Sequence, residues 1–265
     1  MNTTRTFQYA GSFYPDKTAD IKAFIKAALD KAVLKGLPSQ KPKIVIVPHA
    51  GYAYSGQIAA YAYKAISQFN YRNIFLLGPS HYVFASNEIL TCSFGHFETP
   101  LGTVATFKPQ NLPALFKDND NAHALEHSLE VQLPFLQYLN KNYQIFPQLT
   151  NEDNETSLSI VSNFESDFLD NSDDNLLIIS SDLSHYHEYR EAQRKDKQTI
   201  ENILLRDDKG LEERGEACGL MPIVIGLKIA QKLNLKPILL KAANSGDTSG
   251  SFGAPVVGYA AFAFY

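Results

Sequence analysis

Three short apolar runs constrain the fold of this chain more than any other feature. They read IVIV at 44–47, IFLL at 74–77 and LLII at 176–179, and no polar residue interrupts them. A strand that is apolar on both faces is buried on both faces, which is typical of parallel sheets covered by helices. Segments with helical spacing of apolar residues lie between these runs. The pattern therefore predicts an α/β sandwich with a largely parallel or mixed central sheet.

The remaining elements follow from the same periodicities. We expect one domain that spans residues 1–265, because no linker, repeat or low-complexity segment divides the chain. The Gly- and Ser-rich stretch at 244–255 is expected to be a flexible loop over a pocket. We expect strands at 43–47, 73–77, 88–92, 143–149, 175–180, 237–242 and 255–265, and helices at 16–34, 57–69, 128–139, 157–169, 191–205 and 222–233.

Charge and cysteine content exclude several classes of partner. The net charge of −4 provides no basic field that would recruit nucleic acid or an anionic membrane. The longest apolar run, at 256–265, is too short to cross a bilayer, which needs about 20 residues. Two cysteines cannot form a disulfide framework, and this favours a reducing, cytoplasmic setting.

Polar side chains follow three of the predicted strands where each strand ends. His49 follows the strand at 43–47, His81 follows the next strand, and Asp182 and His185 follow the strand at 175–180. Ligands of open α/β sheets bind beyond the carboxyl ends of the strands, so these residues could share one pocket. Spacing alone leaves a second interpretation open, in which each histidine is a turn or core residue.

Two segments, one with Asp182 and His185 and one with Cys218, suggest local chemistry. Asp182 and His185 are three residues apart, so in a helical turn the carboxylate could orient the imidazole. Alternatively, Asp182 caps a helix that begins near Leu183. Cys218 precedes an apolar helix whose dipole would favour the thiolate, although a free cysteine is commonly just a small buried residue. Cys92, inside a strand, fits that second interpretation.

A further cluster reads EHSLE at 126–130. It is not the HExxH pattern of zinc proteases. Glu126, His127 and Ser128 are expected at the start of a helix, where the glutamates would act as caps or first-turn residues. His127 stays a candidate pocket residue.

Seven short motifs follow one another along nearly the whole chain. They read AGSFYP, PHAGYAYSG, GPSHY, EHSLEVQLPFL, SSDLSHY, CGLMPI and SGDTSG. In this order they resemble the Memo family, whose bacterial and archaeal members are also called AmmeMemoRadiSam system protein B. The resemblance implies a fold similar to that of the catalytic subunit of class III extradiol dioxygenases, which are non-haem iron enzymes that open catechol rings.

The resemblance also implies a metal site formed by His49, His81 and Cys218. Asp182 and His185 match the remaining pocket residues, with His185 in the position of the dioxygenase acid/base. The family departs from the dioxygenases in its third ligand, which is a cysteine where they have a glutamate. A thiolate beside two imidazoles favours copper or zinc as well as iron. This chain also has Phe13 where many members have tryptophan.

The resemblance thus implies a metal-dependent oxidoreductase that uses iron or copper, with zinc as a further option. Two other functions stay open on the same residues. One is a binding module for a peptide or small molecule, since family members in animals are described as signalling adaptors. The other is a metal carrier. Similarity of fold alone does not imply ring cleavage.

Overall fold

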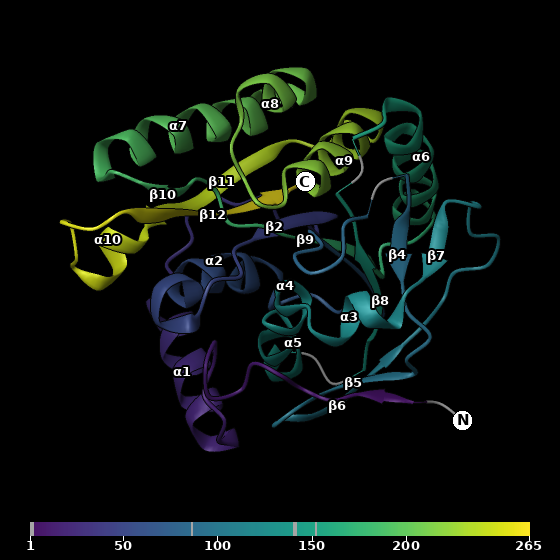
Figure 1. Cartoon of the computed structure of the whole chain (residues 1–265), viewed down its shortest axis with the longest axis horizontal. Coiled ribbons are helices and arrows are strands. Elements are labelled where there is room, and N and C mark those ends of the chain that lie inside the picture. Colours follow the sequence, from purple (N-terminus) through teal and green to yellow (C-terminus); the bar gives the residue numbers. More distant parts are fainter. Residues whose placement is uncertain (1–2, 86, 140–141, 152) are drawn as a thin grey trace.

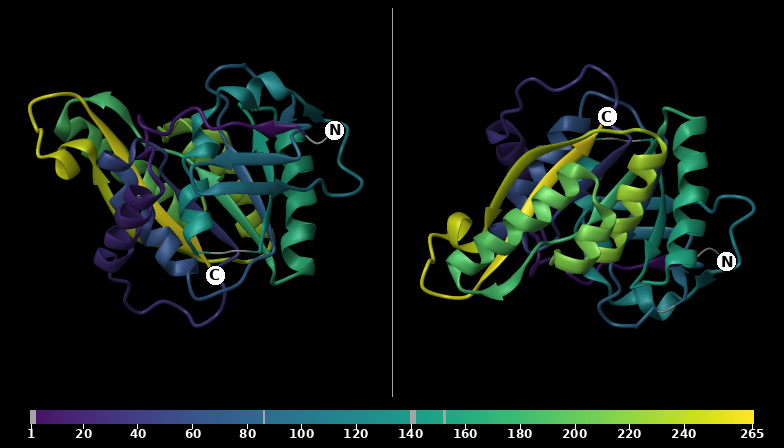
Figure 2. Two further views of the ribbon diagram at one scale, coloured as in Figure 1. Left: turned by 90° about the horizontal axis from the view of Figure 1, so that it is seen from below. Right: turned by 90° about the horizontal axis from the view of Figure 1, so that it is seen from above.

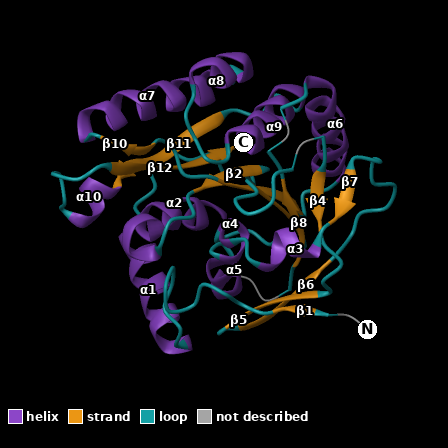
Figure 3. Ribbon diagram, in the orientation of Figure 1, coloured by secondary structure: helices purple, strands orange, loops and turns teal. Residues whose placement is uncertain are grey.

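The computed structural model describes residues 3–85, 87–139, 142–151 and 153–265 (Figures 1 and 3). The strands are β1 (Thr4–Arg5), β2 (Ile44–Val47), β3 (Asn73–Gly78), β4 (Ile89–Thr91), β5 (His96–Thr99), β6 (Gly102–Thr106), β7 (Phe116–Asp118), β8 (Gln144–Leu149), β9 (Asn175–Ser180), β10 (His185–His187), β11 (Pro237–Asn244) and β12 (Val256–Phe264). The helices are α1 (Thr18–Lys31), the π-helix η1 (Tyr52–Gly56), α2 (Gln57–Ile66), α3 (Asp120–Ala124), α4 (His127–Glu130), α5 (Leu133–Leu139), α6 (Glu155–Asn171), α7 (Tyr189–Leu205), α8 (Asp208–Arg214), α9 (Leu220–Lys232) and α10 (Ser245–Ser249).

A single mixed sheet runs through the described part of the chain. Its strand order is β1-β5-β6-β8-β3-β9-β2-β12-β10, with β11 paired to β12 and β4 joined to β7 and β8. The central strands β8, β3, β9 and β2 are parallel, whereas β12 is antiparallel to both β2 and β11. The predicted α/β class with a largely parallel or mixed sheet is confirmed.

Helices cover both faces of this sheet, as the views in Figures 1 and 2 show. Helices α1, α2 and α5 pack on one face, and α6 and α9 pack on the other. In β2, Val45 and Val47 enter the first core, and Ile44 and Ile46 enter the second. Each such buried side chain contributes about 1.5–3 kcal/mol. Within the described residues, no helix combines the length and apolar character needed to span a bilayer.

The parallel register places the ends of three strands level with one another. Val47 of β2 is paired with Ser180 of β9, and Leu77 of β3 is paired with Ile179 of β9. The residues that follow β2, β3 and β9 therefore leave the sheet at one edge, beyond its carboxyl ends. Whether the histidines after these strands share a pocket or are separate turn or core residues depends on how their side chains lie beyond this edge.

Several segments differ from the sequence predictions. The helix expected at 128–139 is divided into α4 and α5. Pro134 explains the break, because it has no N–H to donate to the carbonyl of Glu130 four residues earlier and its ring crowds that carbonyl. The polar stretch at 244–255 contains α10, whose first turn has a capping box between Asn244 and Asp247. The short strands β1, β5, β6, β7 and β10, the π-helix η1 and the helices α3 and α8 were not predicted, since they carry little periodicity.

Both helical interpretations of the segment after β9 are wrong. His185 begins β10, which pairs with β12, and Asp182 caps no helix. The Asp182 carboxylate accepts hydrogen bonds from the backbone N–H groups of His49 and Ala50 instead. Donors from a distant strand end thus replace the local donors that a helix would have supplied.

One carboxyl group lies inside the core without a charged partner. Glu165 faces the sheet from α6 and is fully buried, with Gln148 of β8 as its polar neighbour. Within the described residues, neither side chain has a well-formed hydrogen bond. Burial raises the pKa of Glu165 to about 8, so the folded protein holds this carboxyl group protonated at neutral pH.

Glu165 should therefore make the free energy of unfolding fall as pH rises. The unfolded chain releases this proton near pH 4.5, and the folded chain releases it only near pH 8, so the stabilisation present below pH 4.5 is lost across that window. Each pKa unit corresponds to about 1.4 kcal/mol. Urea unfolding at pH 5 and pH 8 should show a smaller pH dependence for Glu165→Gln than for the wild type. Identical pH dependence in the two proteins would contradict the assignment.

Candidate metal centre

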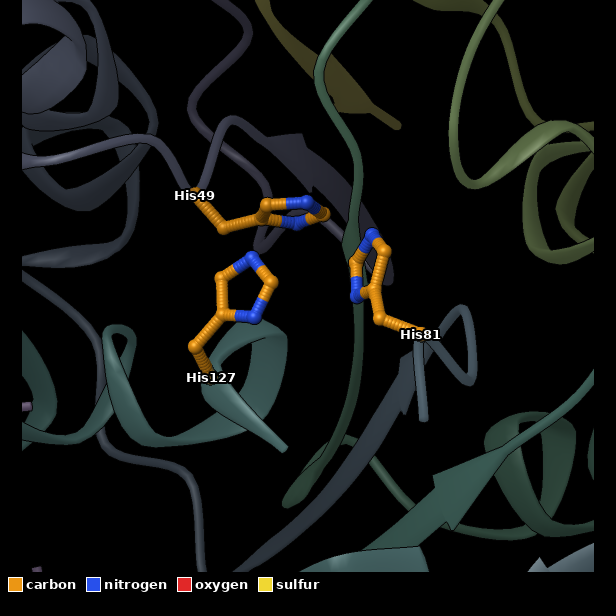
Figure 4. Close-up of side chains that lie close together, drawn as sticks. All are labelled: His49, His81 and His127. Carbon is orange, nitrogen blue, oxygen red and sulfur yellow. The ribbon is translucent and has the colours of Figure 1, made fainter. Parts of the chain in front are cut away.

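Three histidines from separate elements meet beyond the carboxyl edge of the sheet (Figure 4). His49 follows β2, His81 follows β3, and His127 is the first residue of α4. One nitrogen from each ring lies within 4.8 Å of the others. The rings of His81 and His127 stack with centroids 4.4 Å apart, and the His49 ring stands edge-on to both.

The ring of His49 is oriented by Ser180, the last residue of β9. The Ser180 hydroxyl donates to the carbonyl oxygen of Ser128 (2.6 Å) and accepts from Gln132 Nε2 (2.9 Å). Its proton is thus engaged, so the 2.9 Å contact with His49 Nδ1 requires that nitrogen to donate. His49 Nε2 therefore carries a lone pair. Burial, followed by the nearby His81, lowers the pKa of His49 to about 3, which keeps the ring neutral.

The ring of His81 is oriented by Glu126. This buried carboxylate accepts from His81 Nδ1 (2.8 Å), from the His81 backbone N–H (2.7 Å) and from the Ser128 backbone N–H (2.9 Å). Burial alone would raise the pKa of Glu126, but the hydrogen bonds that it accepts from His81 and Ser128 outweigh burial and lower it to about 2. A carboxylate can only accept, so His81 Nδ1 donates and Nε2 is free to bind a metal.

The N-terminal segment packs against His127. The rings of Tyr9 and Phe13 lie 5.5 and 4.9 Å from the His127 ring, measured between centroids. His127 Nδ1 lies 3.4 Å from Glu126 Oε1, and burial, followed by the nearby His49, lowers the pKa of His127 to about 3. The His127 ring, like that of His49, is thus held neutral, and its neighbours restrict its movement.

A buried ion pair holds that N-terminal segment in place. Glu130 of α4 forms an ion pair with Arg5, and both side chains are buried. Glu130 also accepts from the Tyr14 hydroxyl (2.7 Å) and from the backbone N–H of Tyr9 (2.8 Å). Arg5 in turn donates to the carbonyl oxygen of Glu126 (2.9 Å). The two residues therefore connect the N-terminal segment to the helix that carries His127.

Two glycines permit the close approach of the segments that form the site. A Cβ atom on Gly78, at the end of β3, would lie 2.8 Å from Ser128 Oγ and 2.9 Å from Leu129, so α4 could not approach as closely. A Cβ atom on Gly219 would lie 2.7 Å from Ser181. These contacts are shorter than side chains tolerate, so both positions require glycine.

Cys218 lies on another side of His49. Its Sγ is 3.2 Å from His49 Nε2 and accepts from the Asp182 backbone N–H at 3.3 Å. Within the described residues, Cys218 is not part of the three-residue group in which every donor atom lies within 4.8 Å of the others. The expected low pKa is also wrong for the metal-free protein. Burial, followed by the Asp182 carboxylate, raises the pKa of Cys218 far above its usual value.

The other predicted residues surround the same space. Asp182 is buried beside His49, and burial raises its pKa to about 6 despite the two backbone donors. His185 stands at the start of β10, and its backbone N–H donates to Glu216 at 3.2 Å. A cavity of about 600 Å³ opens here, lined by Phe13, His49, Ala50, Gly51, Tyr54, His81, His127, Asp182, His185, Tyr186, Ser245, Pro255, Val257 and Tyr259.

The donor set fits a metal ion. Metal–imidazole bonds measure about 2.0–2.1 Å, so donors that share an ion lie up to roughly 4.2 Å apart, and a small side-chain movement suffices here. His49 Nε2 and His81 Nε2 have lone pairs because their partners hold the protons on Nδ1. In a tetrahedral site a nitrogen and a sulfur ligand are about 3.5 Å apart, close to the distance between His49 and Cys218.

Sequence reasoning did not find the residues that orient the imidazoles. Glu126 was expected only as a cap; it does cap α4, and it also holds His81. Ser180 and Gln132 were not singled out. The motif EHSLE contained Glu126, but no spacing rule connects position 126 to position 81.

Fold and site together define an α/β protein with a candidate histidine metal site at the carboxyl edge of its sheet. A family model described as "Memo-like protein" matches residues 5–263. MEMO1 family proteins of Metallosphaera sedula and Sulfolobus acidocaldarius are 37% and 35% identical to this chain, with 96% of the chain and 97% of each relative covered. A MEMO1 family protein of Thermoplasma volcanium is 34% identical over 94% of both chains. The chain belongs to the Memo-like family, as the sequence motifs predicted.

The role of Glu126 can be tested through metal affinity. Glu126→Gln should weaken Zn(II) binding by about 10–100-fold, because the amide replaces the charge that holds His81 Nδ1–H. Zn(II) competition against a chromophoric chelator measures the change. Glu201→Gln, on the exposed side of α7, is the matched control and should bind as the wild type does. Unchanged affinity in a folded Glu126→Gln protein would show that Glu126 acts only as a cap.

Proposed function

We propose that this chain is a metal-dependent oxidoreductase that binds iron or copper, with zinc as a further option, at His49 and His81. The convergence of these two rings with His127, together with the buried oxygens that hold both Nδ1 atoms, carries the proposal. Imidazoles whose Nδ1 is held by an acceptor or hydroxyl oxygen, so that Nε2 faces the site, are suited to a transition metal. The small number of cysteines favours a cytoplasmic protein.

Two residues compete for the role of third donor. His127 satisfies the geometric condition with His49 and His81. Cys218 is the residue that the family motif implies, and it is 3.2 Å from His49 Nε2. Three imidazoles suit iron, copper and zinc alike, whereas a thiolate shifts the preference towards copper(I) and zinc. We propose that Cys218 is the third metal ligand and that His127 lies on the opposite side of the metal site.

The cavity supplies the other groups that an oxidoreductase needs. A redox metal in this position would supply electron transfer to oxygen or to a bound substrate. His185 lines the cavity, and we propose that it transfers a proton to or from the bound substrate. Asp182 contacts the backbone of His49 and Ala50, so we propose that it fixes the loop after β2. A small molecule or peptide would enter through the cavity mouth.

Anaerobic titrations with Cu(I), Fe(II) and Zn(II) test the ligand set. Cys218→Ser should lose at least about 10–100-fold in Cu(I) affinity, because it removes a direct sulfur ligand. Cys92→Ser is the matched control, since Cys92 is buried and its pKa is raised to about 12 by burial. Equal Cu(I) affinity of the wild type, Cys218→Ser and Cys92→Ser would show that sulfur is not a metal ligand. His127→Ala, titrated in parallel, shows whether His127 is a donor.

Turnover separates the oxidoreductase from a carrier or a binding module. Iron- or copper-loaded protein should consume oxygen in the presence of ascorbate, and His185→Gln should slow consumption by about 10²-fold or more while the metal stays bound. An oxygen electrode and elemental analysis measure the two quantities. Bound metal without oxygen consumption would favour the carrier, and absence of metal binding would favour the binding module.

A further inference from the structure

Four aromatic side chains in the described part of the chain line the cavity, and the two exposed ones, Tyr54 and Tyr186, define its outer half. Tyr54 and Tyr186 line it and are 48% and 77% exposed, whereas Tyr259 lines it from a buried position on β12. Phe13 contributes a fourth ring. Among the described residues that line the cavity, none is a lysine or an arginine, and the one acidic side chain is that of Asp182.

Tyr186 has an unusual backbone for its residue type. Its φ of 59° lies in the left-handed region, which side chains other than glycine and asparagine rarely adopt. The other described non-glycine residues with positive φ are three asparagines and Arg206, and Arg206 ends α7. Strain of this kind is stored mainly at functional sites.

The strain comes from a bulge in β10. His185 is paired with Val257 and His187 with Val256, so Tyr186 is an extra residue between two adjacent pairs. Bulges re-aim side chains and are common beside active sites. His187 is held by Glu216 at 2.6 Å, and the backbone of His185 is held by the same carboxylate. Glu216 thus fixes both neighbours, and the Tyr186 ring is left exposed at the cavity wall.

We infer that the outer half of this cavity recognises the ammonium group of an organic cation, with the ring of Tyr186 as its main contact. The inference rests on the proposed function, because the cation would be the outer end of the ligand that reaches the metal. Aromatic faces attract ammonium groups, and aromatic cages for quaternary ammonium are a known use of this attraction. A carboxylate or phosphate at the same place would find no lysine or arginine there.

Three probes of matched shape test this inference. Choline carries a quaternary ammonium group, 3,3-dimethyl-1-butanol is its neutral analogue, and 3,3-dimethylbutanoate is an anionic one. Saturation-transfer NMR titrations on the metal-free protein measure their affinities. Choline should bind roughly two- to thirtyfold more tightly than the neutral alcohol, and the anion should bind most weakly. Equal or tighter binding of the alcohol or the anion would overturn the inference.

Variants assign the effect to Tyr186. Tyr186→Asn removes the ring but accepts the left-handed backbone, so it should fold at least as stably and should lose the preference for choline over the alcohol. Tyr186→Phe keeps the ring and should keep the preference. Phe84→Ala removes a ring that is 80% exposed and does not line the cavity, so it is the control. An unchanged preference in folded Tyr186→Asn would overturn the assignment.

The two proposals fail separately. Zn(II) titration of the wild type tests the metal site without any organic probe. Choline selectivity in a protein that binds no metal would refute the metal proposal and leave the cation site standing. Metal binding without choline selectivity would refute the cation site alone.

Discussion

The parallel hydrogen bonding of β2 and β3 with β9 is the constraint on which the rest of this structure depends. It aligns three strand ends, so residues far apart in the chain leave the sheet side by side. The bond between the His49 backbone and Asp182, 133 positions apart, is one result. Because each strand is apolar on both faces, a shift in register would not move polar groups into the cores. The strand-end contacts themselves must therefore specify the alignment.

Hydrogen bonds from buried side chains also fix the orientation of the imidazoles of His49 and His81. Ser180 and Glu126 each take part in three hydrogen bonds with backbone and side-chain groups, so neither can turn away from its histidine without leaving buried polar groups unpaired. The ion pair between Arg5 and Glu130 holds the N-terminal segment, whose Phe13 lines the cavity. Removal of one partner from such a buried pair costs about 3–5 kcal/mol, so the cavity wall and the stability of the fold are coupled.

Much of this arrangement was predictable, and the failures have a physical pattern. The apolar runs predicted the sheet, and the rule for strand ends placed His49 and His81 at one edge. The roles of Glu126 and Ser180 could not be predicted, because they depend on how closely α4 approaches β3, which Gly78 allows. Local spacing suggested a helix at Asp182, but backbone donors from the loop after β2 were the better partners. Periodicity describes elements, whereas side-chain orientation depends on contacts between them.

The protonated state of Cys218 has a consequence for how the protein ages. Oxidants attack the thiolate much faster than the thiol, and they need access to sulfur. Here the side chain is only partly buried, but the thiol proton faces His49 and the raised pKa keeps the sulfur protonated. A metal-free molecule would thus resist the irreversible steps to sulfinic and sulfonic acid. The proton that a metal ion must displace from this sulfur would thus also preserve an intact ligand through periods of oxidative stress.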